Sequence, residues 1–145
     1  CMALELTKEY EGQGSEGFLF QEYIPTGGRS LRVVVIGNKF FPYWRVAQNP
    51  DSFYSNLAKG AVIDFDSYPD QKQDAVLSLK KFCLDTGINL AGFDFIFNID
   101  ETDHAPLFLE INYFFRCQGL GGVDNYQKLL ENGVREWLNE VELKN

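Results

Sequence analysis

A β-hairpin is the sequence feature that most restricts how this chain can fold. Residues 31–36 (LRVVVI) are rich in β-branched side chains, which favour a buried strand. The dipeptide Gly37-Asn38 is a typical two-residue hairpin turn, and residues 39–46 (KFFPYWRV) are expected to return antiparallel. Because proline donates no ladder hydrogen bond, Pro42 indicates an edge strand or a bulge. The hairpin therefore predicts an antiparallel sheet.

The order of the other expected elements predicts an α+β fold. One stretch with helical periodicity follows the first hairpin, and another follows a second pair of apolar strands. This order is typical of an antiparallel β-sheet built from two hairpins with helices packed on one side. The expected elements are a helix at 70–87, strands at 91–99 and 106–112 joined by a polar turn at 100–105, and a helix at roughly 125–141.

The apolar faces of the two helices are expected to form part of the core. Gly87 provides a C-terminal stop for the first helix, and Asp124 is expected to cap the second. Tyr43, Trp44, Phe93 and Phe97 are expected in the core rather than in contact with a ligand. The expected core positions of the helices are Val76, Leu79, Phe82 and Cys83 in the first and Tyr126, Leu129, Leu130, Val134, Trp137, Leu138 and Val141 in the second.

Composition limits the classes of function. The 145 residues suffice for one domain with its own core. The net charge of -8 argues against a nucleic-acid-binding protein, which normally presents a basic face. No apolar run approaches the ~20 residues that span a membrane. Three cysteines without metal or disulfide spacing suit a reducing compartment, so we expect a cytoplasmic protein.

The second hairpin is expected to gather polar side chains on one face. Since side chains alternate along a strand, Asp94 and Ile96 share one face of the first strand. Phe108, Glu110 and Asn112 share one face of the second. In the expected register, Asp94 lies opposite Asn112 and Ile96 lies opposite Glu110. This register gathers Asp94, Glu110 and Asn112 at one end of a sheet face. Two carboxylates and a carboxamide suit magnesium, but an ordinary exposed strand explains the same pattern, so both interpretations stay open.

Four blocks of the sequence together carry a family resemblance. The blocks are FLFQEYI (18–24), GGRSLRVVVIGNKFFPYWR (27–45), FYSNLAKGA (53–61), and AGFDFIF (91–97) with PLFLEIN (106–112). In this order they resemble the adenine hinge, the "GxDxRxxVxGxxxxAxxR" hairpin, the "xxSNxxxGG" loop and the "AGxDxx…PxxxExN" metal hairpin of the ATP-grasp superfamily. The likeness is greatest to carboxylate–amine ligases such as glutathione synthetase, D-alanine–D-alanine ligase and the RimK-like ligases that add glutamate to ribosomal protein.

The resemblance implies a role for each matching position. It assigns Gln21, Glu22, Tyr23 and Ile24 to the hinge that pairs with adenine, and Ile96 to the apolar floor beneath it. It assigns Arg32 and Arg45 to phosphates or the acyl group, where a guanidinium fork suits oxyanions. Ser30 stands where the family usually has an acidic residue for the ribose hydroxyls. The remaining assignments are Asn56 and Lys59 to the transferred phosphoryl group, and Asp94, Glu110 and Asn112 to magnesium or manganese.

The resemblance also implies a reaction, and it implies which part of a larger enzyme this chain represents. A substrate carboxylate attacks the γ-phosphate of ATP to give an acyl phosphate, and an amine then displaces the phosphate. Residues 18–145 resemble the C-terminal ATP-grasp subdomain, and residues 1–17 the tail of a missing N-terminal lobe that carries a glycine-rich phosphate loop. The chain is therefore expected to be part of a larger ligase and to be inactive alone.

Some features favour other interpretations. Ser30 and the segment 113–119 (YFFRCQG), which departs from the family's small-residue "xxPG" loop, favour a non-catalytic nucleotide-binding module. Arg32 and Arg45 have a second interpretation as exposed strand residues, and Lys59 has one as a solvated lysine in a loop. A metal-dependent hydrolase using Asp94 and Glu110 lacks a histidine or further acidic groups. Leu120, Val123 and the aromatic residues of 113–115 are expected to belong either to a partner surface, such as that of a homodimer, or to the missing lobe.

Overall fold

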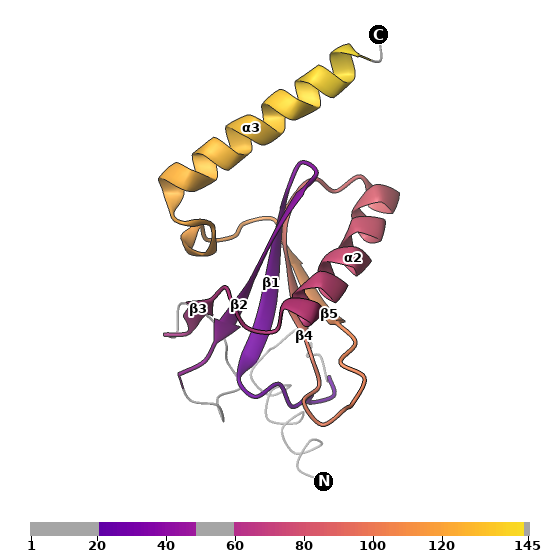
Figure 1. The fold of residues 1–145 in the computed structure, drawn as a ribbon, viewed down its shortest axis with the longest axis vertical. Helices are drawn as coiled ribbons and strands as arrows, with labels where there is room; N and C mark the ends of the chain where they lie inside the picture. Colours follow the sequence, from indigo (N-terminus) through magenta and orange to yellow (C-terminus); the bar gives the residue numbers. More distant parts are fainter. Residues whose placement is uncertain (1–20, 49–59, 144–145) are drawn as a thin grey trace, which may run out of the picture.

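The computed structural model describes residues 21–48 and 60–143 of the chain. Expectations for residues 1–20 and 49–59 lie outside the described part. An antiparallel sheet in the order β3-β2-β1-β4-β5 carries two long helices (Figure 1), which confirms the α+β class and the two hairpins. The elements are β1 (Arg29–Ile36), β2 (Lys39–Val46), β3 (Val62–Asp64), α2 (Pro69–Thr86), β4 (Leu90–Ile96), β5 (Leu107–Asn112), the 3-10 helix η2 (Gln118–Leu120) and α3 (Val123–Glu142).

The first hairpin forms as expected. β1 and β2 pair along their whole lengths across the turn at Gly37-Asn38. Gly37 has a φ of 59°, a left-handed conformation that glycine adopts without strain. β3 pairs only with residues 44–46 of β2, so no described strand lies beside Pro42 on its outer edge. A proline is tolerated at that edge because no ladder hydrogen bond is needed there.

Helix α2 covers one face of the sheet. Ala75 and Leu79 are buried among the β1 and β4 side chains that point to this face. Phe82, although 40% exposed, packs its ring against Phe93 with the ring centroids 5.9 Å apart. The helix ends at Gly87, as expected, where a left-handed φ of 75° lets the backbone N–H donate to a carbonyl of the last turn. Val76 and Cys83, the other expected core positions, are half-buried against the same cluster.

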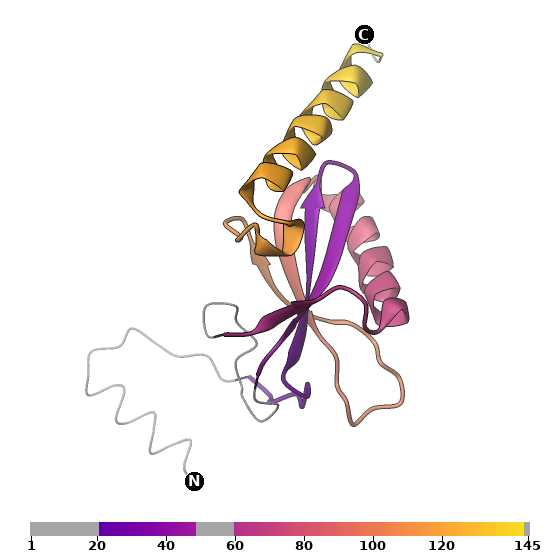
Figure 2. The same cartoon turned by 60° about the vertical axis from the view of Figure 1, so that its left-hand side comes forward.

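Helix α3 contacts the opposite face of the sheet and extends past the tip of the first hairpin (Figures 1 and 2). Its first turns pack on Val34 and Ile36, which alternation in β1 turns away from α2. The two helices therefore lie on different faces instead of sharing one side. The expected cap also differs, because the helix begins after Gly122 and Asp124 lies in its first turn. Of the expected core face, Tyr126, Leu129 and Leu130 are half-buried, whereas Val134, Trp137, Leu138 and Val141 are 39–54% exposed.

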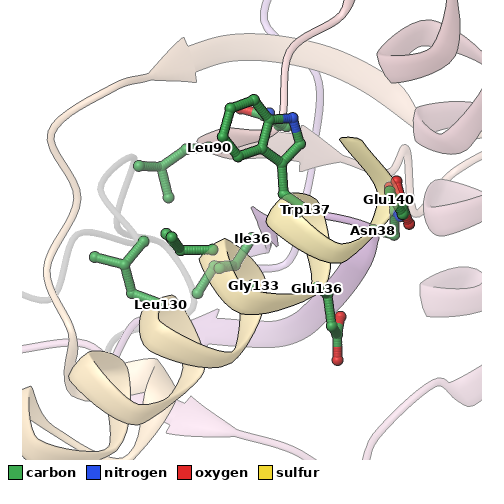
Figure 3. A pocket seen from close by; sticks show the side chains of 11 residues that line it. Ile36, Asn38, Leu90, Leu130, Gly133, Glu136, Trp137 and Glu140 are labelled. Carbon is green, nitrogen blue, oxygen red and sulfur yellow. The ribbon is translucent and has the colours of Figure 1, made fainter. Parts of the chain in front are cut away.

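The contact between α3 and the hairpin depends on a close approach of two glycines. Gly133 is the one buried residue of α3, and a Cβ there would lie 3.1 Å from Cγ2 of Ile36. A Cβ on Gly37 would lie 3.6 Å from the Cα of Gly133. A groove opens beside this crossing (Figure 3), with an apolar lining that includes Leu90, Leu130 and Trp137 and with the polar pairs Lys39–Glu136 and Asn38–Glu140 nearby.

The second hairpin forms, but its register differs from the expected one. Asp94 lies opposite Glu110, and Gly92 lies opposite Asn112. The ladder then skips Leu109, because the next pair joins the residue after Asp94 to Phe108. This β-bulge returns Phe108 to the α2 face, where its ring lies 5.8 Å from that of Phe95. Alternation alone predicted that Phe108 lies beside the polar groups. The bulge instead places it on the opposite face of the sheet.

Asp64, at the end of β3, gives the fold a pH-dependent contact. Its Oδ1 accepts the backbone N–H groups of Asp66 and Ser67 at 2.9 and 3.0 Å. Hydrogen bonds from Ser67, first by its side chain and then by its backbone, and from Asp66 hold the pKa of Asp64 at about 2. Arg29, with its Nη1 3.4 Å from Oδ2, adds a smaller contribution in the same direction.

We predict that Asp64→Asn lowers the free energy of unfolding by about 1 kcal/mol near neutral pH. The folded pKa lies below the unfolded one, so this stability is present above about pH 4 and is lost as the pH falls toward 2. Urea unfolding across this pH range measures the difference between the proteins. Asp85→Asn, an exposed residue of α2, controls for the loss of one charge. A difference that stays constant from pH 6 to 2 would contradict the assignment.

Candidate functional site

The sheet face opposite α2 carries a cluster of polar side chains from four strands. Arg32 of β1 lies opposite Asp94 of β4, and Asp94 lies opposite Glu110 of β5. Arg45 of β2 lies two residues beyond Tyr43, which is opposite Arg32. Because side chains alternate along each strand, all of these positions point to the same face. The pairing of the strands therefore builds the cluster from residues far apart in the sequence.

Asp94 holds two buried arginines. Its carboxylate accepts Nε of Arg32 at 2.7 Å and Nη2 of Arg32 at 2.6 Å, a two-bond fork. Nη2 of Arg45 lies 3.0 Å from Oδ2 of the same carboxylate. Asp94 is 0% exposed, and the two arginines are 9% and 8% exposed. Three charges thus share a nearly dry site, where their interactions are stronger than on the surface.

The two guanidinium groups respond differently to this environment. Burial lowers the pKa of Arg32, but the hydrogen bonds and the charge of Asp94 outweigh it and raise the pKa above its ordinary value. Burial lowers the pKa of Arg45, and the charge of Asp94 offsets this only in part. Both groups stay charged at neutral pH because a guanidinium holds its proton far above that range. The site therefore presents two fixed positive charges.

Glu110 and Asn112 complete the cluster at its solvent side. Nδ2 of Asn112 donates to Oδ2 of Asp94 at 3.2 Å and to Oε1 of Glu110 at 3.1 Å. Glu110 is exposed and Asn112 is half-buried. The structure therefore brings together Asp94, Glu110 and Asn112, the trio expected from the sequence, although the strand register differs.

The trio fits a hard cation only in part. Glu110 offers carboxylate oxygens at the solvent side, as magnesium requires, whereas the amide NH2 of Asn112 faces both carboxylates, so its carbonyl oxygen would meet the same ion only after the amide turns. Both oxygens of Asp94 already accept arginine N–H groups, so Asp94 could join a metal only by releasing an arginine. The described residues contain no cluster of three or more carboxylate, histidine or cysteine side chains suited to a metal.

The residues expected to bind adenine lie at the end of β4 and just before β1, the two strands that carry Asp94 and Arg32. Residues 21–24 have no regular secondary structure; the first three are exposed and Ile24 is half-buried. The carbonyl of Pro25, directly after them, accepts the N–H of Ile99 at 3.0 Å, which ties this segment to the chain leaving β4. Ile96, near the end of β4, is half-buried and by alternation shares the face of Asp94.

Ser30 serves as a partner for Arg45. Its hydroxyl accepts Nε of Arg45 at 3.1 Å and Nη2 at 2.9 Å, and the residue is 2% exposed. The hydroxyl thus helps to hold the guanidinium beside Asp94. Asn56 and Lys59 lie outside the described residues.

Sequence reasoning missed two residues that contact the cluster. Tyr43, expected to be an ordinary core residue, is 1% exposed and lies on the face of the arginines. Gly119 packs against it so closely that a Cβ there would lie 2.1 Å from the tyrosine Cζ. Alternation from Arg45 could have placed Tyr43 on this face, but no sequence signal indicates the contact with Gly119, which depends on the path of the chain after β5.

No helix in the described part of the chain has both the length and the apolar character that a membrane span requires. Cys83 and Cys117 are both free thiols, and burial raises the pKa of Cys83.

Comparison with known proteins identifies relatives. The RimK-like ATP-grasp domain family matches residues 5–131. A probable alpha-L-glutamate ligase of Coxiella burnetii is 32% identical over 111 residues, which are 76% of this chain and 34% of the relative. A probable alpha-L-glutamate ligase of Stutzerimonas stutzeri is 29% identical over 111 residues, which are 75% of this chain and 33% of the relative. The chain thus spans about a third of the length of these curated relatives.

Two solved structures are similar at a low level. Macrocyclase MdnB from Microcystis aeruginosa MRC is 23% identical with a TM-score of 0.42, over 90% of this chain and 40% of that one. Macrocyclase MdnC from the same source, bound with precursor peptide MdnA, is 23% identical with a TM-score of 0.48, over 76% of this chain and 33% of that one.

We predict that Asp94→Asn destabilises the protein by about 3–5 kcal/mol, because it leaves two buried guanidinium groups without their shared counter-ion. Denaturant unfolding at neutral pH measures the loss. Asp100→Asn, an exposed residue in the loop between β4 and β5, is the matched control and is expected to change stability little. If Asp94→Asn costs no more than the control, the ion cluster does not stabilise the fold.

Proposed function

Because the chain belongs to the RimK-like ATP-grasp family, we propose that it is the ATP- and magnesium-binding C-terminal portion of a carboxylate–amine ligase. The observation that carries this proposal is the convergence of Arg32, Arg45, Asp94, Glu110 and Asn112 on one face of the sheet. The set combines fixed positive charges with oxygen ligands for a cation. A site that activates a carboxylate with a nucleotide phosphate requires both.

The proposed reaction forms an amide bond in two steps. An oxygen of the substrate carboxylate attacks the γ-phosphorus of ATP, the bond to ADP breaks, and an acyl phosphate results. The nitrogen of an amine then attacks the acyl carbon, inorganic phosphate leaves, and the nitrogen loses a proton. The protein's part is to position the reactants and to neutralise the charge that passes between oxygens.

Arg32 and Arg45 are the proposed positive partners of the reacting oxyanions. Their guanidinium groups are held at the base of the cluster by Asp94, and that of Arg45 also by Ser30. A guanidinium fork matches the geometry of a phosphoryl or carboxylate group, and both groups stay charged at neutral pH. Their fixed orientation means that little reorganisation is needed when the charge on the substrate changes.

Glu110, Asn112 and Asp94 are the proposed metal ligands, and only Glu110 needs no rearrangement, because the amide of Asn112 must turn its oxygen toward the ion. A bound magnesium ion, or manganese in its place, would neutralise phosphate charge. The carboxylate of Glu110 lies at the solvent side of the cluster, and Asn112 is half-buried beside it. The arginine–carboxylate contacts of Asp94 mean that its use as a metal ligand requires an exchange of partners.

The remaining assignments follow the family resemblance. We propose that Gln21, Glu22, Tyr23 and Ile24 bind the adenine edge, with Ile96 beneath the ring. The hydrogen bond from Ile99 to the carbonyl of Pro25, which joins the chain before β1 to the chain after β4, supports this proposal. Ser30 is proposed to face the ribose, although in the present arrangement its hydroxyl accepts hydrogen bonds from Arg45. Asn56 and Lys59 are proposed to lie near the transferred phosphoryl group.

The substrates, the further domains and the cellular location of the enzyme are also proposals. The relatives named as probable alpha-L-glutamate ligases make glutamate the first amine to test. Because the matched residues are only about a third of the length of those relatives, we propose that further domains supply the rest of their site. The two free thiols fit a reducing cytoplasm, where we propose that the enzyme acts.

We predict that the 145-residue chain binds ATP in the presence of magnesium and that Glu110→Gln weakens this binding tenfold or more, roughly the loss seen when a metal site loses a supporting group. With magnesium removed by a chelator, the two proteins should bind ATP equally. Calorimetric titration measures both affinities, and Glu131→Gln, an exposed carboxylate of α3, is the matched control. Equal affinity of the wild type and Glu110→Gln for ATP with magnesium would contradict the metal assignment.

A turnover assay separates the ligase from a non-catalytic nucleotide-binding module. We predict that the chain alone releases no ADP with glutamate as the amine and acetate as a simple carboxylate. ADP release by the chain that depends on glutamate would show that it is active without further domains. If the complete protein binds ATP but releases no ADP with any carboxylate and amine pair, the non-catalytic interpretation is correct.

A further inference from the structure

The hydroxyl of Tyr43 is a buried polar group without a hydrogen bond. It is the one buried side-chain oxygen or nitrogen among the described residues that lacks a partner. Buried polar groups in proteins are almost always paired, because an unpaired one loses its hydrogen bonds to water without replacing them. An exception of this kind next to two arginines and a carboxylate therefore needs an explanation.

The tyrosine ring is held in a fixed position. The backbone of Gly119 packs on the hydroxyl-bearing end of the ring, with the nearest ring carbons 2.1–2.4 Å from where a Cβ would stand. Phe65 lies against the ring from another direction, with the centroids 6.2 Å apart. The residue also belongs to a buried cluster with Val34 and Ile36. The ring cannot turn its hydroxyl toward solvent without disrupting these contacts.

The groups around the hydroxyl offer it no acceptor. Arg32 and Arg45 carry only donors, and the Asp94 carboxylate already accepts four hydrogen bonds or ion-pair contacts. Burial raises the pKa of Tyr43, and the nearby charge of Arg32 opposes this rise in part. No group is placed with the geometry of a hydrogen bond to the hydroxyl. Since burial, the largest cause, raises that pKa, the hydroxyl keeps its proton at neutral pH. It is a donor without an acceptor.

We propose that Tyr43 is a further ligand-binding residue, whose hydroxyl donates a hydrogen bond to an anionic oxygen that Arg32 and Arg45 hold. The anionic oxygen belongs to a phosphoryl group or to a carboxylate. The hydroxyl is enclosed in the present arrangement, so the anion reaches it by taking over an arginine from Asp94. This inference rests on the proposed function and adds a third donor to the oxyanion site.

The test compares Tyr43→Phe with the wild type, because the change removes only the hydroxyl. Without ligand, the thermal unfolding midpoint of the variant should equal or exceed that of the wild type, since no hydrogen bond is lost. With ligand, the dissociation constant for ATP with magnesium should rise about tenfold or more, as expected for a hydrogen bond to a charged group. Tyr68→Phe, on the other face of the sheet beside Trp44, is the matched control and should change neither quantity.

Separate titrations identify the source of the anion. Inorganic phosphate and glutamate are each added to the wild type and to Tyr43→Phe, and the ligand whose affinity falls in the variant supplies the oxygen. Adenosine, which carries no anionic group, should bind both proteins equally.

Three results would overturn the inference, each in a distinguishable way. If Tyr43→Phe binds ATP, phosphate and glutamate as the wild type does, the hydroxyl is not a ligand contact, and the proposed function stands without it. If the variant is less stable than the wild type without ligand, the hydroxyl has a structural partner. If the wild type binds none of these ligands, the proposed function fails, and this inference fails with it.

Discussion

The ion cluster around Asp94 is the interaction on which the rest of the site depends. One carboxylate on β4 joins guanidinium groups from β1 and β2 and an amide from β5, so four strands meet at a single charged group. Removing charges from water is costly, and the cost is recovered only when each charge has partners of good geometry. The fork from Arg32 and the support of Arg45 by Ser30 provide that geometry.

In the proposed function, the same cluster changes its contacts when ligands bind. A carboxylate shared by two arginines can exchange them for a cation, and the arginines can exchange the carboxylate for an anion. Under the proposed function, a metal-bound phosphate would offer both replacements together, and a nucleotide with magnesium would therefore bind the cluster better than either part alone. Tyr43, with a hydrogen-bond donor still unused, is consistent with an arrangement completed only when the ligand arrives.

Much of the fold and part of the site could be predicted from the sequence. The turn at Gly37-Asn38 and the stop at Gly87 are local signals, and both were confirmed. The register of the second hairpin was predicted wrongly, because β4 ends at Ile96 rather than at residue 99 and the bulge at Leu109 shifts the pairing by a further residue. The pairing of Asp94 with arginines was also missed, since it joins strands 62 residues apart. The contact of Gly119 with Tyr43 depends on the path of the chain after β5.

The account is tested most directly by a crystal structure of the protein grown with manganese and a non-hydrolysable ATP analogue. The anomalous signal of manganese locates the metal independently of the protein coordinates. We predict a manganese peak at Glu110 and Asn112, with the terminal phosphates facing Arg32 and Arg45. Manganese and nucleotide bound elsewhere, with the Asp94–arginine contacts unchanged, would contradict the claim that this face of the sheet is the nucleotide site.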